Sequence, residues 1–224
     1  LKWSNYYRVA VSWNILLGFP GETNEDYRRQ IELLPSLFHL QAPEATGKFW
    51  LQRFSPYFTR PHEYGVRITG PGMAYKYVYD SVRLDLLKIA YDFEYELDHW
   101  PVDPHLYQEL VSLVEEWQRR ARGSDRPFLY YSKAMDYVTV YDGRDPQAPT
   151  RQRFDWPAAD IIEACNEAAK SRDQIRVLLQ EVIGDRTLTD HELNAALGAL
   201  TNRRILYEER EKYFTLAIPE NQFL

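Results

Sequence analysis

The sequence predicts an α/β chain in which a parallel βαβ unit is followed by an α+β region with a winged-helix outline. Two observations lead to this expectation. The first is a nearly continuous apolar run, Val9–Leu17, that passes through Gly18–Thr23 into a helical pattern. The second is a series of three helical segments and a β-hairpin near the end of the chain.

The composition is that of a globular protein. Of the 224 residues, 45% are hydrophobic and 27% are charged, which excludes global disorder. The formal net charge of -6 argues against a general phosphate-binding surface. No uninterrupted apolar run approaches the roughly 18 residues of a membrane helix, and the first residues do not form a signal peptide. We therefore expect a cytoplasmic protein without a membrane partner.

Residues 1–60 form the first of three expected stretches. After the strand Val9–Leu17, a helix is expected from the N-cap Thr23, and Pro35 should kink or end it. A second strand is expected at Phe49–Phe54. Because two parallel strands cannot bury both faces alone, and the chain begins with Leu1, we expect the C-terminal part of a longer protein.

Residues 61–124 form the second stretch, an expected helical connector that closes the sheet region. A helix is expected at Ser81–Tyr91 and an alternating strand at Asp92–Leu97. From the N-cap Asp103, a long amphipathic helix should run to Gly123, with its arginines late, as the helix dipole favours.

Residues 125–224 form the third stretch, the expected winged-helix-like domain. Its first two strands should form a hairpin, and Thr189 with Glu192 makes a capping box for its third helix. The expected elements are strands Phe128–Tyr131 and Tyr137–Tyr141, a helix Pro157–Lys170, a helix after Ser171, a helix after Thr189, and strands Ile205–Tyr207 and Tyr213–Ile218.

Two local features bear on chemistry. The turn Gly18–Thr23 follows a buried parallel strand, where α/β sheets bind ligands, although a tight turn without a ligand explains it equally well. Cys165 is the single cysteine, so this chain alone forms no disulfide and holds no iron–sulfur cluster or cysteine-based zinc site. Its helical surroundings favour a buried apolar role.

Three blocks of sequence resemble the later barrel strands of a cobalamin-binding radical S-adenosylmethionine (SAM) protein. They are Trp13–Thr23 followed by Asp26-Tyr27, His39-Leu40-Gln41, and Arg53–Phe58. Within that superfamily, the blocks are most similar to enzymes that mature ribosomally made peptides. The resemblance covers roughly residues 1–100.

The resemblance implies the last βα units of a partial radical SAM (β/α) barrel, with SAM, a [4Fe–4S] cluster and cobalamin in the full-length protein. It makes residues of the first strand and its turn candidates for contacts to SAM. Glu22 then either contacts the cofactor or is a first-turn acid, and Arg53 contacts SAM or substrate or forms an ion pair that closes the barrel. The candidates are Asn14, Ile15, Gly18, Pro20, Gly21, Glu22 and Arg53.

One departure from the family is clear. The radical chemistry requires a Cys-x-x-x-Cys-x-x-Cys motif, and this chain has Cys165 alone. We expect the cluster and cobalamin regions upstream in the same polypeptide and no metal ligand here. The catalytic residues are not identified by this sequence.

The third stretch has three readings: capture of a precursor's leader peptide, docking onto the barrel, or DNA binding. With 13 basic and 17 acidic residues, its net charge of -4 weakens the DNA reading. For a leader added to a sheet edge beside the third helix, the expected groove residues are Tyr137, Thr139, Tyr141, Asn194, Leu197, Gly198 and Thr201. The leading hypothesis is a peptide C-methyltransferase, and the alternative is a non-catalytic winged-helix adaptor or regulatory module that binds DNA or protein.

Overall fold

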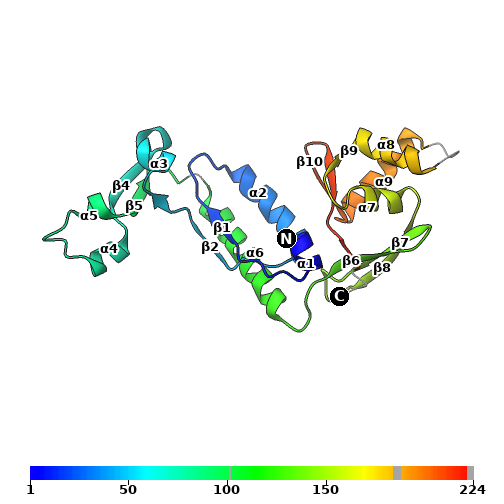
Figure 1. The fold of residues 1–224 in the computed structure, drawn as a ribbon, viewed down its shortest axis with the longest axis horizontal. Helices are drawn as coiled ribbons and strands as arrows, with labels where there is room; N and C mark the ends of the chain where they lie inside the picture. The colour runs from blue at the N-terminus through cyan, green and yellow to red at the C-terminus, as the bar shows by residue number, and fades with distance from the viewer. Residues whose placement is uncertain (101, 184–187, 221–224) are drawn as a thin grey trace. The chain divides into compact units, whose positions relative to one another are not determined.

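A computed structural model describes residues 1–100, 102–183 and 188–220, and shows a mixed α/β fold (Figure 1). Its strands form several small sheets, and no closed barrel occurs among the described residues. The chain separates into two compact units. The first unit comprises Leu1–Ser12, Leu33–Ala42 and Glu116–Leu224, and the second comprises Trp13–Glu32 and Pro43–Glu115. These boundaries differ from the three expected stretches, whose functional division stays a prediction.

The predicted βαβ connection is confirmed in the second unit. Strands β1 (Asn14–Leu17) and β2 (Ala45–Lys48) pair in parallel, and between them the chain forms α2 (Asn24–Leu33) and the 3₁₀ turn η1 (Leu34–Leu37). Both strands are shorter than predicted, and the predicted position of the second strand was wrong. The Phe49 N–H still donates to the Leu17 carbonyl at 3.0 Å, but the chain then leaves β1.

The segment Phe49–Phe54, predicted as the second parallel strand, instead contributes β3 to a second, antiparallel sheet of this unit. Its strand order is β3 (Leu51–Gln52), β5 (Asp92–Leu97), β4 (Val66–Pro71). Strand β5 lies where the sequence predicted it. Short helical elements surround the sheet: α3 (Pro56–Thr59), η2 (Pro61–Tyr64), α4 (Met73–Val78) and α5 (Leu86–Ile89).

The predicted helix at Ser81–Tyr91 was largely wrong, because only α5 forms within it. The Asp85 carboxylate accepts the Leu87 N–H and starts the helix there, and Ala90 is extended. Upstream of Asp85, Val82 is 93% exposed, so its apolar spacing meets no core. Helical periodicity without a surface to bury against does not produce a long helix.

The long predicted helix is confirmed as α6 (Pro104–Arg122). The Asp103 carboxylate accepts the N–H of His105 at 2.8 Å, as expected of an N-cap. Late in the helix, in the first unit, Trp117 is fully buried, stacks on Phe38 and donates its indole N–H to the Leu40 carbonyl at 3.1 Å. No helix of the described residues has the length and apolar character to cross a bilayer.

The first unit contains a four-stranded sheet. The predicted hairpin is confirmed as β6 and β7, while β8 and β12 were not predicted. The strand order is β12 (Ile218–Pro219), β6 (Leu129–Lys133), β7 (Tyr137–Asp142), β8 (Thr150–Asp155). In β8 only Phe154 is buried, which explains why its polar sequence gave no strand signal.

Three helices follow β8 along the chain, in the predicted order, and share one hydrophobic core with this sheet. They are α7 (Ala158–Ala164), α8 (Arg172–Ile183) and α9 (Asp190–Asn202), and α9 has the predicted capping box. The helix predicted at Pro157–Lys170 ends early, at α7, and leads into β9. A small sheet orders β10 (Leu206–Glu209), β11 (Lys212–Thr215), β9 (Lys170–Ser171), and α1 (Lys2–Tyr6) begins the chain.

Candidate functional site

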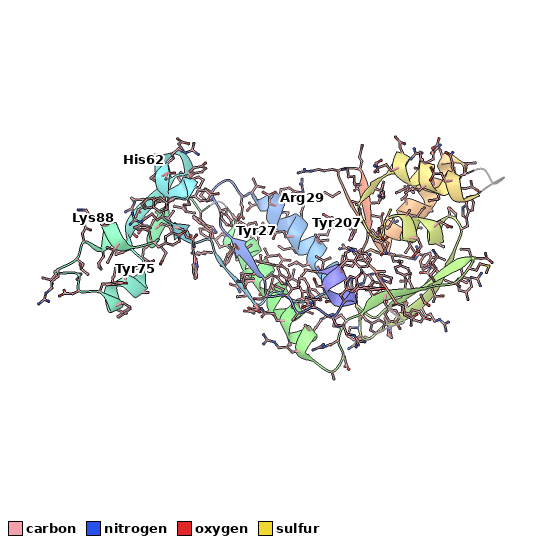
Figure 2. The ribbon with its side chains drawn as sticks, viewed as in Figure 1. Tyr27, Arg29, His62, Tyr75, Lys88 and Tyr207 are labelled. Atoms are coloured by element: carbon pink, nitrogen blue, oxygen red, sulfur yellow. The ribbon has the colours of Figure 1, made fainter. Side chains whose placement is uncertain are left out.

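The glycine-rich turn after β1 is held by its own side chains. Gly18 adopts φ +81° and Gly21 φ +96°, conformations that favour glycine. The Gly18 N–H donates both to the Glu22 carboxylate at 2.8 Å and to the Tyr27 hydroxyl at 2.9 Å. The Tyr27 O–H in turn donates to Glu22 at 2.8 Å, from its place on α2 (Figure 2). Burial raises the pKa of Tyr27, so the phenol stays protonated and keeps this bond.

Glu22 is not in the first turn of α2, and its contact with a cofactor stays a prediction. Glu22 precedes α2 and closes a hydrogen-bonded ring with Gly18 and Tyr27. A ligand at this turn would therefore find the Gly18 N–H already hydrogen-bonded to Glu22 and Tyr27. Gly18 also lies against Trp100, because a Cβ placed on it would come within 2.5 Å of the indole ring.

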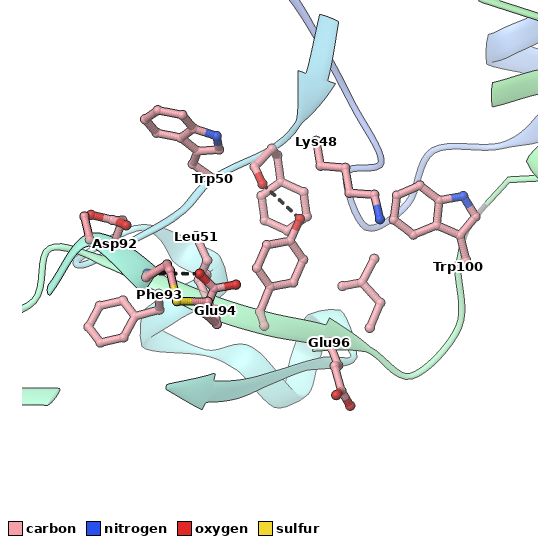
Figure 3. Close-up of a pocket in the computed structure, with 13 residues that line it drawn as sticks. Lys48, Trp50, Leu51, Asp92, Phe93, Glu94, Glu96 and Trp100 are labelled. Atoms are coloured by element: carbon pink, nitrogen blue, oxygen red, sulfur yellow. Dashed lines mark hydrogen bonds between the residues drawn. The ribbon is translucent and has the colours of Figure 1, made fainter. Parts of the chain in front are cut away.

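A cavity of about 950 Å³ opens beside Trp100 (Figure 3). It begins at Lys48, the last residue of β2, and is lined by the segment that follows, by the start of α4 and by β5. The carboxyl ends of parallel strands are where α/β sheets bind ligands. None of the residues predicted to contact a cofactor lines this cavity, although Trp100 of its wall lies against Gly18.

The cavity combines aromatic walls with charges of both signs. The Lys48 ammonium lies 4.4 Å from the Trp100 ring centroid, and Figure 3 shows it pointing toward that ring. The Tyr95 O–H donates to the Phe49 carbonyl at 2.9 Å, and burial raises the pKa of Tyr95 to about 12. Trp50, at the rim, is 75% exposed. A planar ligand could stack on such rings.

Acidic side chains complete the lining and give it hydrogen-bond acceptors. Asp92, Glu94 and Glu96 come from β5, and Glu94 accepts the Met73 N–H at 3.1 Å. Glu96 pairs with Arg67. Carboxylates beside aromatic rings suit a ligand that carries hydroxyl or ammonium donors.

The residues predicted to contact a cofactor do not all lie together. Gly18, Pro20, Gly21 and Glu22 share the turn, with Pro20 half-buried and Gly21 exposed. Asn14 is exposed and Ile15 half-buried at the other end of β1, which at about 3.3 Å per residue is roughly 13 Å from the turn.

Arg53 is engaged by backbone carbonyls and aromatic rings, and its predicted contact with SAM or substrate stays a prediction. Its Nε–H donates to the Ala90 carbonyl at 2.6 Å, its Nη2 group donates to the Leu87 carbonyl, and its guanidinium stacks on Phe58 and Phe93. Arg53 therefore holds the carboxyl end of α5 onto the sheet, and it forms no ion pair with a carboxylate of the described residues.

The second candidate site is the free edge of β8. At the two ends of the β6–β7 pair, the Gly143 N–H donates to the Phe128 carbonyl and the Ala134 N–H donates to the Tyr137 carbonyl. Because hydrogen-bonded positions alternate along an antiparallel pair, the odd-numbered residues of β7 direct their backbone groups to β6. Even-numbered ones face β8, where they meet Thr150, Gln152 and Phe154. The backbone N–H and C=O groups of Arg151, Arg153 and Asp155 consequently point away from the sheet, and no other described strand pairs with them.

The predicted groove residues fall on opposite faces of this sheet. Val138 and Val140 belong to one buried core with Leu197 of α9, so α9 covers that face. Strand alternation places Tyr137, Thr139 and Tyr141 on the other face. On that face, the guanidinium of Arg153 lies 3.9 Å from the Tyr137 ring centroid.

The end of α9 nevertheless approaches β8. Arg203, the C-cap of α9, donates from Nε to the Gln152 side chain at 3.0 Å. Of the other predicted groove residues, Asn194 is exposed and accepts from Arg172 at 2.8 Å, Gly198 is exposed, and Thr201 is half-buried. The open edge of β8 beside Arg203 is therefore a different candidate site from the predicted groove, and peptide binding by the groove residues stays a prediction.

Among protein-family models, curated proteins and solved structures, nothing matches this chain. Assignments of function therefore rest on the residues and their geometry.

Cys165 does not fit a cluster ligand. It is fully buried as the C-cap of α7, and burial raises the pKa of its thiol to about 12, so it stays protonated at neutral pH. No group of three His, Cys, Asp or Glu side chains suited to a metal occurs within the described part of the chain.

The cavity residues Lys48, Trp50, Tyr95 and Trp100 were missed by sequence reasoning. They come from two segments of the chain about 50 residues apart and carry no local motif. The one available signal was indirect: a glycine with positive φ next to a strand end implies a close neighbour, but the sequence does not say which.

Proposed function

We propose that this chain is the C-terminal portion of a cobalamin-dependent radical SAM enzyme that methylates a carbon of a ribosomally made peptide. In this proposal residues 125–220 hold the leader of the precursor peptide, while the turn after β1 and its neighbouring cavity contribute to the SAM pocket. The three sequence blocks that resemble the family support the enzyme class.

The observation that supports binding of a leader peptide is the open edge of β8. Outward backbone groups at Arg151, Arg153 and Asp155 can pair with an extended peptide, which would add a fifth strand to the sheet. Arg151, Arg153 and Arg203 flank this edge, and Asp155 is partly neutralised by Arg153 at 2.7 Å. The edge therefore favours a leader strand with acidic side chains.

The order of elements supports a winged-helix relationship for residues 158–215. Helix α7, strand β9, helices α8 and α9, and the hairpin β10–β11 follow one another, with β9 pairing onto β11. This order is compatible with the alternative, a non-catalytic adaptor or regulator. Binding of DNA is disfavoured because α9 contains no lysine or arginine and the hairpin turn carries three glutamates against two bases.

The SAM part rests on the cavity of about 950 Å³ at the carboxyl end of β2. Its volume and its mixture of rings and carboxylates fit an adenosine-containing ligand. In the full-length enzyme, SAM and the cluster would supply a 5′-deoxyadenosyl radical and cobalamin a methyl group. Cys165 does not suit the cluster, so the contribution of this chain in the proposal is to bind and position SAM and peptide.

The test uses the complete protein, expressed anaerobically. Iron, cobalamin and SAM cleavage should all be present, whereas a non-catalytic adaptor would have none of them. Deleting residues 125–224 should retain SAM cleavage and weaken leader binding at least tenfold. Unchanged affinity for the leader in a deletion variant that still cleaves SAM would rule out the recognition role.

The variant Trp50→Ala tests the cavity. We expect SAM to bind about tenfold more weakly, because stacking of a base on an aromatic ring contributes about 1–3 kcal/mol. Trp50 is 75% exposed, so its loss should leave the fold intact. Phe54→Ala is the matched control, since Phe54 is 76% exposed and does not line the cavity. Calorimetric titration with SAM measures both, and equal affinities would remove Trp50 from the site.

A further inference from the structure

Two neighbouring cavities in the first unit have not been described so far, and the larger of them shares Tyr137 and Asp155 with the sites above. One, of about 360 Å³, is enclosed by α1, β6, the end of α7 and β12. The other, of about 680 Å³, lies at the β6–β7 turn and the start of α7. Both are lined by Lys133 and Glu163, whose Nζ and Oε2 atoms are 2.8 Å apart. The Lys133–Glu163 ion pair thus lies in the wall that the two cavities share.

The lining is strongly acidic. Of its carboxylates, Glu163 is paired with Lys133, and Asp155 with Arg153. Among the described lining residues Lys133 is the one base. Four further carboxylates have no ion pair in the described part of the chain: Asp136 and Asp160 in the larger cavity, and Glu167 and Glu220 in the smaller. Both hollows therefore attract cations.

Aromatic rings form the other walls. In the smaller cavity Trp3, Tyr6 and Tyr7 meet edge to face, with the Tyr6 ring centroid 5.4 Å from that of Trp3 and 4.9 Å from that of Tyr7. Tyr137 and Trp156 line the larger one. Faces of such rings attract ammonium and guanidinium groups, and adjacent carboxylates accept their N–H donors.

The protein already uses this chemistry once, on the buried side of α1. The Lys2 Nζ atom lies 5.4 Å from the Trp3 ring centroid and 5.0 Å from that of Phe214, and burial lowers the pKa of this amine to about 7. It donates to the side chain and carbonyl of Asn166 and to the Thr215 carbonyl, at 2.6, 3.1 and 2.7 Å. A lysine side chain is therefore compatible with the rings and oxygens of this region.

We propose that these two cavities bind a peptide segment carrying lysine or arginine side chains. Asp136, Glu167 and Glu220 are exposed, so the N–H donors of a bound peptide would replace water at these carboxylates, and a quaternary ammonium has no such donors. A single small amine would occupy one hollow, whereas an extended peptide with bases at alternate positions can place one side chain in each. This inference does not depend on leader binding at β8.

The test is a titration of the chain with a capped hexapeptide of alternating lysine and glycine, at low ionic strength. The double variant E167Q/E220Q should bind at least tenfold more weakly. Its control, E209Q/E211Q, makes the same charge change at exposed glutamates of the β10–β11 region, outside both cavities, and should stay within twofold of the wild type. Tyr7→Ala, at a 63% exposed ring, should cost about fivefold.

Three results would overturn the proposal. Equal losses in the two double variants would mean general attraction to an acidic protein. Binding of the matching glutamate hexapeptide with similar affinity would exclude charge recognition. Loss of lysine-peptide binding in R151P/R153P would place the peptide on the β8 edge instead, whereas unchanged binding there supports two separate sites.

Discussion

Under the proposed function, replacing Arg151 and Arg153 together by proline is expected to weaken binding of a leader peptide to the complete protein about 100-fold. Both residues direct their N–H groups away from the sheet, so proline removes two donors for an added strand without breaking a β7–β8 hydrogen bond. Each lost donor leaves a carbonyl of the leader unpaired, at about 1–3 kcal/mol. Two such losses give about 2.7 kcal/mol, a factor of about 100.

The matched control is the double variant R151A/R153A, which removes the same charges but keeps the backbone donors. Its affinity for the leader should fall by less than tenfold, with a weaker dependence on salt. Fluorescence anisotropy with a labelled leader measures both variants, and thermal unfolding verifies their folds. If the alanine and proline variants bind equally, the leader does not pair with this edge.

Local sequence signals predicted the elements that depend on local chemistry. The capping box at Thr189 and Glu192, the N-cap at Asp103 and the alternation in Asp92–Leu97 each appear in the structure. The failures occur where tertiary contacts decide. The second parallel strand lies at Ala45–Lys48, a segment with little apolar character, because it pairs with β1 and its neighbour Phe49 fills a core.

The candidate sites were predictable to a lesser degree. The turn at Gly18 was recognisable, since two glycines after a strand have a conformational reason, but the strand itself is exposed at Asn14 and Leu16 rather than buried on both faces. Its partner Trp100 lies some 80 residues away along the chain. The sequence also predicted correctly that the third stretch has strands followed by helices. It did not predict β8, the strand that carries the open edge. A strand with one buried side chain, Phe154, has no hydrophobic alternation to reveal it.

Acidification from pH 6.5 to pH 4 is expected to remove about 3 kcal/mol of folding stability through His39. This side chain is 7% exposed, and burial lowers its pKa from 6.5 to about 4. Its Nε2–H donates to the Leu216 carbonyl at 3.0 Å, which the neutral ring satisfies. Asp142 faces the ring, but it is paired with Arg144 at 2.6 Å and offers a new charge little support.

The direction of this change in stability follows from the difference in proton binding between the unfolded and the folded chain. Below pH 6.5 the unfolded chain takes up a proton on His39 that the folded chain refuses until about pH 4, so stability is complete above 6.5 and falls as pH falls through this window. At 1.36 kcal/mol per pKa unit, the interval of 2.5 gives about 3 kcal/mol. The variant His39→Gln keeps an N–H donor and does not titrate, so urea denaturation should show a shallower loss between pH 6.5 and 4. Because other carboxylates titrate equally in both proteins, parallel pH profiles would show that His39 is not the group responsible.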